Sequence, residues 1–138
     1  MIKNILFAFV LCSLSLFTQA QKSSYKIVYD LVSSDTADHS TVLRQFNNIL
    51  KEAPGAELEV VCHGQAVYML VAEKVFFENR MKELQSKGKV SFKICANSMR
   101  RFGIDKSQLI SLAEIVPVAI LELASKQQEG WSYIKAGH

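Results

Sequence analysis

The stretch that decides the fold is residues 90–101, VSFKICANSMRR, where an apolar run ends at Cys95 and leads directly into a helix start. The first six of these residues are rich in β-branched and aromatic side chains, which is typical of a strand. Asn97 and Ser98 belong to the residue types that cap helix N-termini, so we expect a helix to begin there. A strand followed at once by a helix is a building unit of α/β folds.

Strand-like and helix-like segments alternate on both sides of this stretch. The expected strands cover residues 25–32, 58–62, 90–95, 114–116 and 131–135. The expected helices are a segment with apolar residues from Val42 to Leu50, residues 66–85 with an irregularity near 71–75, a short helix from Asp105 to Leu112, and residues 118–128 with Val118 and Leu121 facing inward. Such alternation requires crossover connections. The sequence therefore predicts an α/β fold, a three-layer α/β/α sandwich with a mostly parallel sheet of about five strands.

The first twenty residues are typical of a secretory signal. Lys3 provides a positive start, residues 5–17 form an apolar run, and small residues at 18 and 20 suit a cleavage site after Ala20. The apolar run is shorter than the roughly 20 residues that a membrane span needs. We expect a signal peptide at residues 1–20, an exported protein that is periplasmic or secreted, no stable membrane span after cleavage, and a single domain over residues 21–138.

Composition excludes several classes of protein. The formal net charge is +3 at pH 7, and cleavage would remove Lys3 and no acidic residue, leaving +2. Lysines and glutamates are interspersed along the chain, so we expect no nucleic-acid partner. A phosphate-binding loop, a nucleophile-elbow serine and a dinucleotide fingerprint are absent from the sequence. We expect no cofactor, and Cys62, His63 and Cys95 are too few ligands for a metal site.

Reactive side chains stand at the ends of two expected strands. Ligands of open parallel sheets bind at the carboxyl ends of the strands. Cys95 holds such a place in front of a helix start, where free amides and the helix dipole lower a thiol pKa, and Arg100 and Arg101 add positive charge. His63 follows the neighbouring expected strand and can orient or deprotonate a bound group. The sequence predicts a reactive thiolate at Cys95.

Four motifs resemble the DsrE/DsrF-like family, which includes sulfur-relay subunits that carry persulfide sulfur on a cysteine. They are residues 61–64 (VCHG), 92–99 (FKICANSM) with Gly103, 115–118 (IVPV) and 129–135 (EGWSYIK). The resemblance implies a persulfide-carrying or sulfurtransferase-like protein, with Cys95 as the relay cysteine. It also implies a homo-oligomer, trimer or hexamer, and a sulfur donor or acceptor protein or a small anion as partner. The candidate catalytic residues are Cys95 and His63, and the candidate ligand-binding residues are Cys62, Gly64, Asn97, Ser98, Arg100 and Arg101.

A different class of function fits the same residues. The alternative is a non-catalytic small-ligand-binding or assembly module of the cell envelope, with Cys95 structural or disulfide-bonded to Cys62. That bond requires neighbouring strands and Cα atoms within about 7 Å.

Overall fold

The computed structural model describes residues 24–137 and contains one sheet of five parallel strands. The strand order is β4-β3-β2-β1-β5, and every neighbouring pair runs parallel. The strands are β1 (Lys26–Leu31), β2 (Glu57–Cys62), β3 (Lys89–Cys95), β4 (Ala113–Val116) and β5 (Ser132–Ala136). The predicted α/β class and parallel sheet are confirmed.

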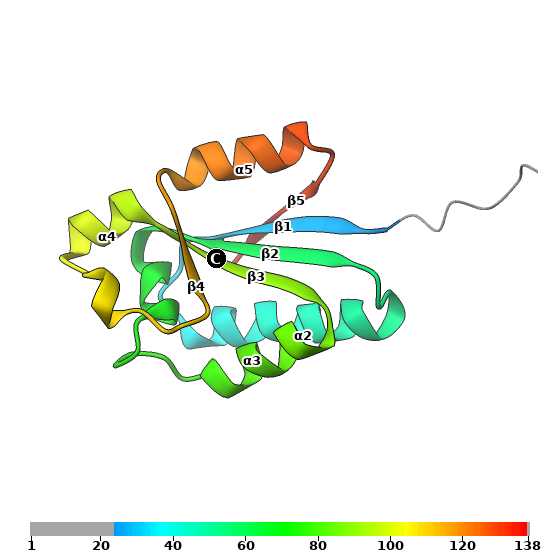
Figure 1. Ribbon diagram of the computed structural model, residues 1–138, viewed down its shortest axis with the longest axis horizontal. Coiled ribbons are helices and arrows are strands. Elements are labelled where there is room, and N and C mark those ends of the chain that lie inside the picture. The colour runs from blue at the N-terminus through cyan, green and yellow to red at the C-terminus, as the bar shows by residue number, and fades with distance from the viewer. Residues whose placement is uncertain (1–23, 138) are drawn as a thin grey trace, which may run out of the picture.

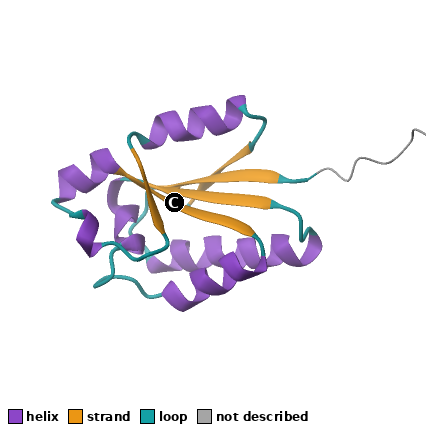
Figure 2. Ribbon diagram, viewed as in Figure 1, coloured by secondary structure: helices purple, strands orange, loops and turns teal. Residues whose placement is uncertain are grey.

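Helices cover both faces of this sheet and one of its ends. They are α2 (Thr36–Glu52), the 3-10 helix η2 (Gly64–Leu70), α3 (Glu78–Lys87), α4 (Ala96–Phe102), the 3-10 turn η3 (Lys106–Gln108) and α5 (Ala119–Gln128). In Figure 1, α2 and α3 lie on one face, α5 lies on the other, and α4 lies beyond the carboxyl ends of the strands. Figure 2 shows the resulting three layers of helix, strand and helix.

The main apolar core lies between the sheet and the pair α2 and α3. Leu43 and Phe46 of α2 are fully buried there, and the ring of Tyr29 meets that of Phe46 edge-on, with centroids 5.1 Å apart. Burying one such large apolar side chain contributes about 1.5–3 kcal/mol. Because strand side chains alternate between faces, this core fixes which residues of each strand point toward α5.

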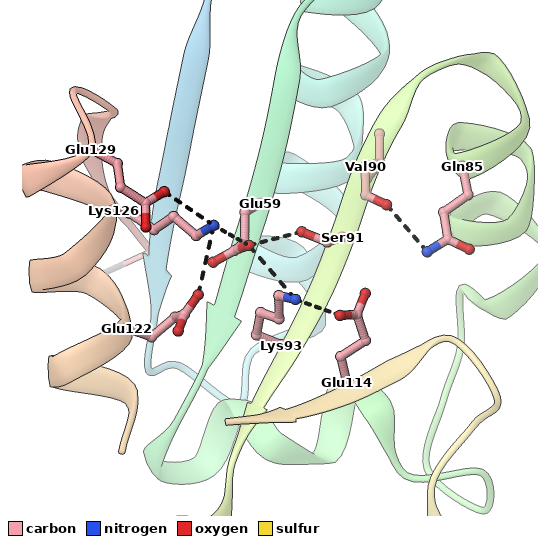
Figure 3. A network of polar contacts seen from close by, with 9 residues as sticks. All are labelled: Glu59, Gln85, Val90, Ser91, Lys93, Glu114, Glu122, Lys126 and Glu129. Atoms are coloured by element: carbon pink, nitrogen blue, oxygen red, sulfur yellow. Dashed lines mark hydrogen bonds and ion pairs between the residues drawn. The ribbon is translucent and has the colours of Figure 1, made fainter. Parts of the chain in front are cut away.

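The layer between the sheet and α5 is smaller and partly charged. Its apolar cluster contains Val28, Val61, Cys95, Val116, Ala119 and Leu123. Figure 3 shows the remaining part, where Glu59 of β2 lies between Lys93 and Lys126. Glu59 accepts a hydrogen bond from the Ser91 hydroxyl at 3.0 Å, and its carboxylate lies 3.6 Å from the Lys126 ammonium. Ion pairs as well as apolar contacts therefore hold α5 on the sheet.

The inward face of α5 differs from the one predicted. Val118 is the N-cap rather than a residue of the helix, and Leu121 is 65% exposed. Ala119 and Leu123 are the buried positions instead. The helix is turned so that Lys126 faces the carboxylate of Glu59, since leaving that buried charge unpaired would be costly.

Two predicted helices are shorter than expected, for one shared reason. The expected helix over residues 66–85 is divided into η2 and α3, and the expected helix through Leu112 is only the turn η3. Ile110 donates to the carbonyl of Leu70 at 3.0 Å, and Ala72 donates to that of Gln108 at 2.8 Å. These long-range bonds use backbone groups that longer helices would need, so both helices end there.

The chain connections place β3 and β4 where ligands bind in such folds. The strand order advances from β1 to β4 in one direction, and α5 then returns across the other face to β5. In open parallel sheets, ligands bind at the carboxyl ends of the strands. Cys95 and Val116 are paired at that position.

The described part of the chain contains no helix with the length and apolar character needed to cross a membrane. The signal peptide expected at residues 1–20 lies outside the described residues.

Candidate functional site

Cys95 ends β3 and is itself the N-cap of α4. The sequence placed Asn97 or Ser98 at the cap, but the helix already begins at Ala96. The strand and the helix follow each other without a loop. This brings the cysteine side chain beside the free amides of the first turn of α4.

The surroundings of the Cys95 sulfur favour its ionised form. Burial works against the thiolate, but hydrogen bonds from the Ser98 backbone, the Ala119 backbone, the Ser98 hydroxyl and the Asn97 backbone outweigh it and lower the thiol pKa. The amide of Ala119 donates to Sγ at 3.4 Å. Donors from α4 and from the start of α5 thus converge on one sulfur. Hydrogen bonding of this kind to a charged group is what activates a thiol as a nucleophile.

Cys95 has little access to solvent, with 4% of the residue exposed. Its neighbours Val116, Ala119 and Leu123 belong to the apolar cluster beneath α5. The start of α5 covers the sulfur, since the Ala119 amide contacts it.

Cys62 has a different environment, and the two cysteines are not bonded. Both are free thiols. Their strands are neighbours, but Cys62 is paired with Ile94, so Cys95 points to the opposite face of the sheet. Cys62 accordingly belongs to the main core and Cys95 to the cluster under α5. The disulfide allowed as an alternative is wrong, because the sheet lies between the sulfurs.

Burial raises the pKa of the Cys62 thiol to about 12, and the residue has no exposed surface. At neutral pH Cys62 is therefore a protonated core residue. The structure places it outside the group of side chains that surround Cys95.

Gly64 connects the end of β2 to the Cys95 site. Its amide donates to the Ser98 hydroxyl at 2.9 Å. Its φ is +54°, and a Cβ at this position would lie 2.9 Å from Cγ1 of Val32. Both the backbone conformation and the close approach of Val32 require glycine here. Gly64, a candidate ligand-binding residue, thus bonds to the same Ser98 hydroxyl that contacts the Cys95 thiol.

His63 lies on the same edge of the sheet and is held by a carboxylate. Cys62 and Ile94 are the last paired residues of β2 and β3, so His63 and Cys95 come next along neighbouring strands. The His63 Nε2 lies 2.7 Å from Oδ1 of Asp30. The sequence-predicted pair His63 and Cys95 is therefore brought to one edge, where the Ser98 hydroxyl contacts both the Gly64 amide and the Cys95 thiol.

Asp30 is the centre of a second group of polar side chains at this edge. Its Oδ2 accepts a hydrogen bond from the Tyr133 hydroxyl at 2.6 Å and lies 3.5 Å from the Lys135 ammonium. Burial opposes ionisation of Asp30, but the hydrogen bonds from Tyr133 and His63 lower its pKa overall. The same bond to Asp30 raises the pKa of Tyr133 to about 12. Asp30 is thus a buried carboxylate that keeps its charge.

Sequence reasoning missed Asp30, Tyr133 and Lys135 as members of the site. One signal was present, since Asp30 is the sole acidic residue in the expected strand YKIVYDLV. Tyr133 belongs to β5, 103 residues further along the chain, and only the pairing of β5 with β1 brings it close.

The predicted arginines lie away from the sulfur. Arg100 donates to the Asn97 side chain, and the Arg101 guanidinium lies over the ring of Phe102. Both arginines are exposed in the last turn of α4. The groups that lower the Cys95 pKa are instead backbone amides and one hydroxyl.

The described residues offer no cluster of three or more His, Cys, Asp or Glu side chains arranged to hold a metal ion. The arrangement that is present, a thiol surrounded by donors beside a carboxylate-bound histidine, suits chemistry at sulfur.

Two solved structures have folds similar to that of this chain. A solved structure from Methanobacterium thermoautotrophicum, the protein of unknown function MTH1491, matches with a TM-score of 0.75 at 24% identity, over 81% of this chain and 99% of its own. The conserved protein of unknown function BT1422 from Bacteroides thetaiotaomicron matches with a TM-score of 0.66 at 13% identity, over 85% of this chain and 99% of its own. A search of curated proteins gave no significant match.

The fold and site define a parallel α/β/α sandwich with a cysteine at the carboxyl edge of its sheet. A family model described as DsrE/DsrF-like matches residues 26–136. The chain therefore belongs to the DsrE/DsrF-like family, as its motifs suggested.

Proposed function

We propose that the protein carries sulfane sulfur as a persulfide on Cys95 and passes it between a donor and an acceptor. The observation that carries this proposal is the set of hydrogen-bond donors that lowers the pKa of the Cys95 thiol. A persulfide also ionises readily, so the same donors stabilise the loaded form as well as the empty one. Family membership adds support, since the DsrE/DsrF-like resemblance implies sulfur relay.

The chemistry needs no cofactor and balances with thiosulfate as donor. The Cys95 thiolate attacks the outer sulfur of thiosulfate, a bond forms between the two sulfurs, and the bond of that outer sulfur to the sulfonate breaks. Sulfite leaves with the electron pair, and Cys95 becomes a persulfide anion. A small anionic donor also suits a cysteine of which only 4% is exposed.

The non-catalytic alternative, a binding or assembly module, does not require an ionised thiol. Loading of sulfur separates the two functions. The reduced protein is incubated with thiosulfate, and the intact mass is recorded. We expect wild type to gain the mass of one sulfur atom, Cys95→Ser to gain nothing, and Cys62→Ala to load as wild type does because Cys62 is protonated and buried. An unchanged wild-type mass would refute sulfur carriage from this donor class.

We also infer that the protein acts as a homo-oligomer. Ile115 of β4 and Ile120 and Leu121 of α5 are exposed by 40%, 60% and 65%. Large apolar side chains that stay exposed on a protein favour burial against another chain. A second copy of this chain would cover them, in a trimer or hexamer as the family resemblance implies. Light scattering should give a mass above that of the monomer, and Leu121→Glu should reduce it.

We further infer that this function is exerted outside the cytoplasm, periplasmic or secreted, on the basis of the N-terminal sequence. The partner is then a donor or acceptor of sulfur in the cell envelope. Fractionation of cells that produce the full chain tests this, with the shorter chain expected outside the cytoplasm. Recovery of the full-length chain in the cytoplasm would contradict it.

A further inference from the structure

We propose that Asp30 and Tyr133 position His63 to protonate the leaving thiol when the sulfur donor is a thiol persulfide. The inference rests on the proposed function and names the donor class that needs these residues. The three residues come from three neighbouring strands. Asp30 lies in β1, His63 follows β2 and Tyr133 lies in β5.

The contacts of Asp30 determine which nitrogen of His63 is available. The carboxylate, which has no hydrogen to donate when ionised, lies 2.7 Å from Nε2. Nε2 must therefore carry a hydrogen, and the neutral ring then has its lone pair on Nδ1. The His63 side chain is 20% exposed, so a small bound molecule can reach it.

Tyr133 in turn holds the carboxylate of Asp30. Its hydroxyl donates to Oδ2 at 2.6 Å, while Oδ1 faces His63. Each oxygen of Asp30 thus has its own hydrogen-bond donor, and Lys135 provides a further positive charge at 3.5 Å. A buried carboxylate that is bonded on both oxygens has little freedom to rotate. The orientation of the His63 ring is fixed accordingly.

The step with a thiol persulfide, R–S–SH, requires a proton to move. Sγ of Cys95 bonds to the outer sulfur, the S–S bond of the donor breaks, and the electron pair remains on R–S⁻. The hydrogen of the transferred sulfur passes to Nδ1 of His63 and from there to the leaving thiolate. The products are the Cys95 persulfide anion and R–SH. The inner sulfur of the donor is reduced as Sγ is oxidised to the persulfide state.

Thiosulfate needs no such proton, because its leaving group, sulfite, is stable as an anion. The two donors deliver the same atom to the same cysteine and differ in the leaving group. A residue that acts through His63 should therefore affect one donor and spare the other. A residue that only maintains the fold around Cys95 should affect both equally.

The test compares loading rates of Cys95 with cysteine persulfide, a small thiol persulfide, and with thiosulfate in wild type and Asp30→Asn. The asparagine keeps the shape of the side chain but can present a hydrogen to Nε2, which moves the ring hydrogen to Nδ1. General acid-base assistance is worth about 10²–10⁴-fold, so we expect Asp30→Asn to load from cysteine persulfide at least about tenfold more slowly. Loading from thiosulfate should stay within about twofold of wild type.

A matched control is Glu59→Gln, which replaces another carboxylate that is buried on the same face of the sheet. Glu59 lies toward the amino end of β2, away from Cys95, so both donors should load as in wild type. Tyr133→Phe removes one hydrogen bond to Asp30 and should show the same donor preference as Asp30→Asn, with a smaller effect.

Nitrogen NMR of the unloaded protein gives a readout that does not depend on sulfur transfer. In wild type His63 should carry its hydrogen on Nε2, and in Asp30→Asn a substantial fraction should carry it on Nδ1. Equal slowing of both donors in a folded Asp30→Asn protein, or an unchanged tautomer, would overturn this inference while sulfur carriage stands. Failure of wild type to load from either donor would instead refute the proposed function.

Discussion

Ser98→Ala isolates one hydrogen bond of the Cys95 site. The Ser98 hydroxyl lowers the pKa of the Cys95 thiol, and it accepts a hydrogen bond from the Gly64 amide at 2.9 Å. Alanine removes this donor and leaves the backbone amides of Asn97, Ser98 and Ala119 in place. The thiolate loses one of its stabilising contacts, so we expect the thiol pKa to rise.

The size of the rise follows from the strength of such a bond. A hydrogen bond to a charged group contributes about 1.5–3 kcal/mol. One pKa unit corresponds to about 1.36 kcal/mol, which gives a rise of roughly 1–2 units. Because several donors share the charge of the sulfur, the lower end of about one unit is expected here. At a pH below both thiol pKa values, the thiolate fraction of Ser98→Ala should then be about tenfold lower than that of wild type.

The assay is the rate of iodoacetamide alkylation of Cys95 as a function of pH, with the modified residue identified by peptide mapping. Ser98→Thr is the matched control, since it keeps a hydroxyl at the same position. The pH midpoint of its alkylation rate should lie close to that of wild type. Circular dichroism verifies that each variant is folded. If Ser98→Ala alkylates with the same midpoint as wild type, the hydroxyl does not stabilise the thiolate and the reasoning fails.

Three further predictions concern other parts of the molecule. Gly64→Ala should lower the free energy of unfolding by about 1–3 kcal/mol in a denaturant titration, because alanine at positive φ is strained and its Cβ meets Val32; an unchanged midpoint would contradict this. Burial raises the pKa of Glu59, so the carboxyl contributes stability below its unfolded pKa that is lost as the pH rises through the folded value. The unfolding free energy of wild type relative to Glu59→Gln should therefore fall as the pH rises above about 4, and a rise with pH would refute the assignment. Iodoacetamide should modify Cys95 but spare Cys62 in the folded protein at neutral pH, since the Cys62 thiol is buried and protonated; equal labelling would show that the core opens.

The sequence predicted the strands well because their apolar runs are local signals. The expected strand over residues 90–95 corresponds to β3, and the expected parallel arrangement follows from the alternation of elements. It also placed Cys95 and His63 at the ends of such runs, where β3 and β2 do end. The residue that ends a strand can be predicted from the apolar run of that strand alone.

Features that depend on distant residues were not predictable in this way. The expected helix over residues 66–85 is interrupted because Leu70 and Ala72 bond to the backbone of Gln108 and Ile110. Leu121 points outward because Lys126 of the same helix meets the buried Glu59 of β2. Apolar periodicity within a segment contains no information about either partner.

The second half of the site shows the same limit. Tyr133 reaches Asp30 only because β5 returns to pair with β1, a connection that crosses the whole sheet. Likewise, the opposite orientations of Cys62 and Cys95 follow from the register of β2 and β3 rather than from their sequence spacing. Strand order and register decide which of the candidate residues can act together.

The most direct test of the central claim is the chemical state of Cys95 after exposure of the reduced, folded protein to thiosulfate. Alkylation followed by peptide mapping reports whether the Cys95 side chain ends in one sulfur or two. If Cys95 carries sulfur, the Cys95 peptide should hold an alkylated persulfide and the Cys62 peptide an unmodified thiol. A Cys95 that alkylates readily as a plain thiol, with no second sulfur at any thiosulfate concentration, would contradict it.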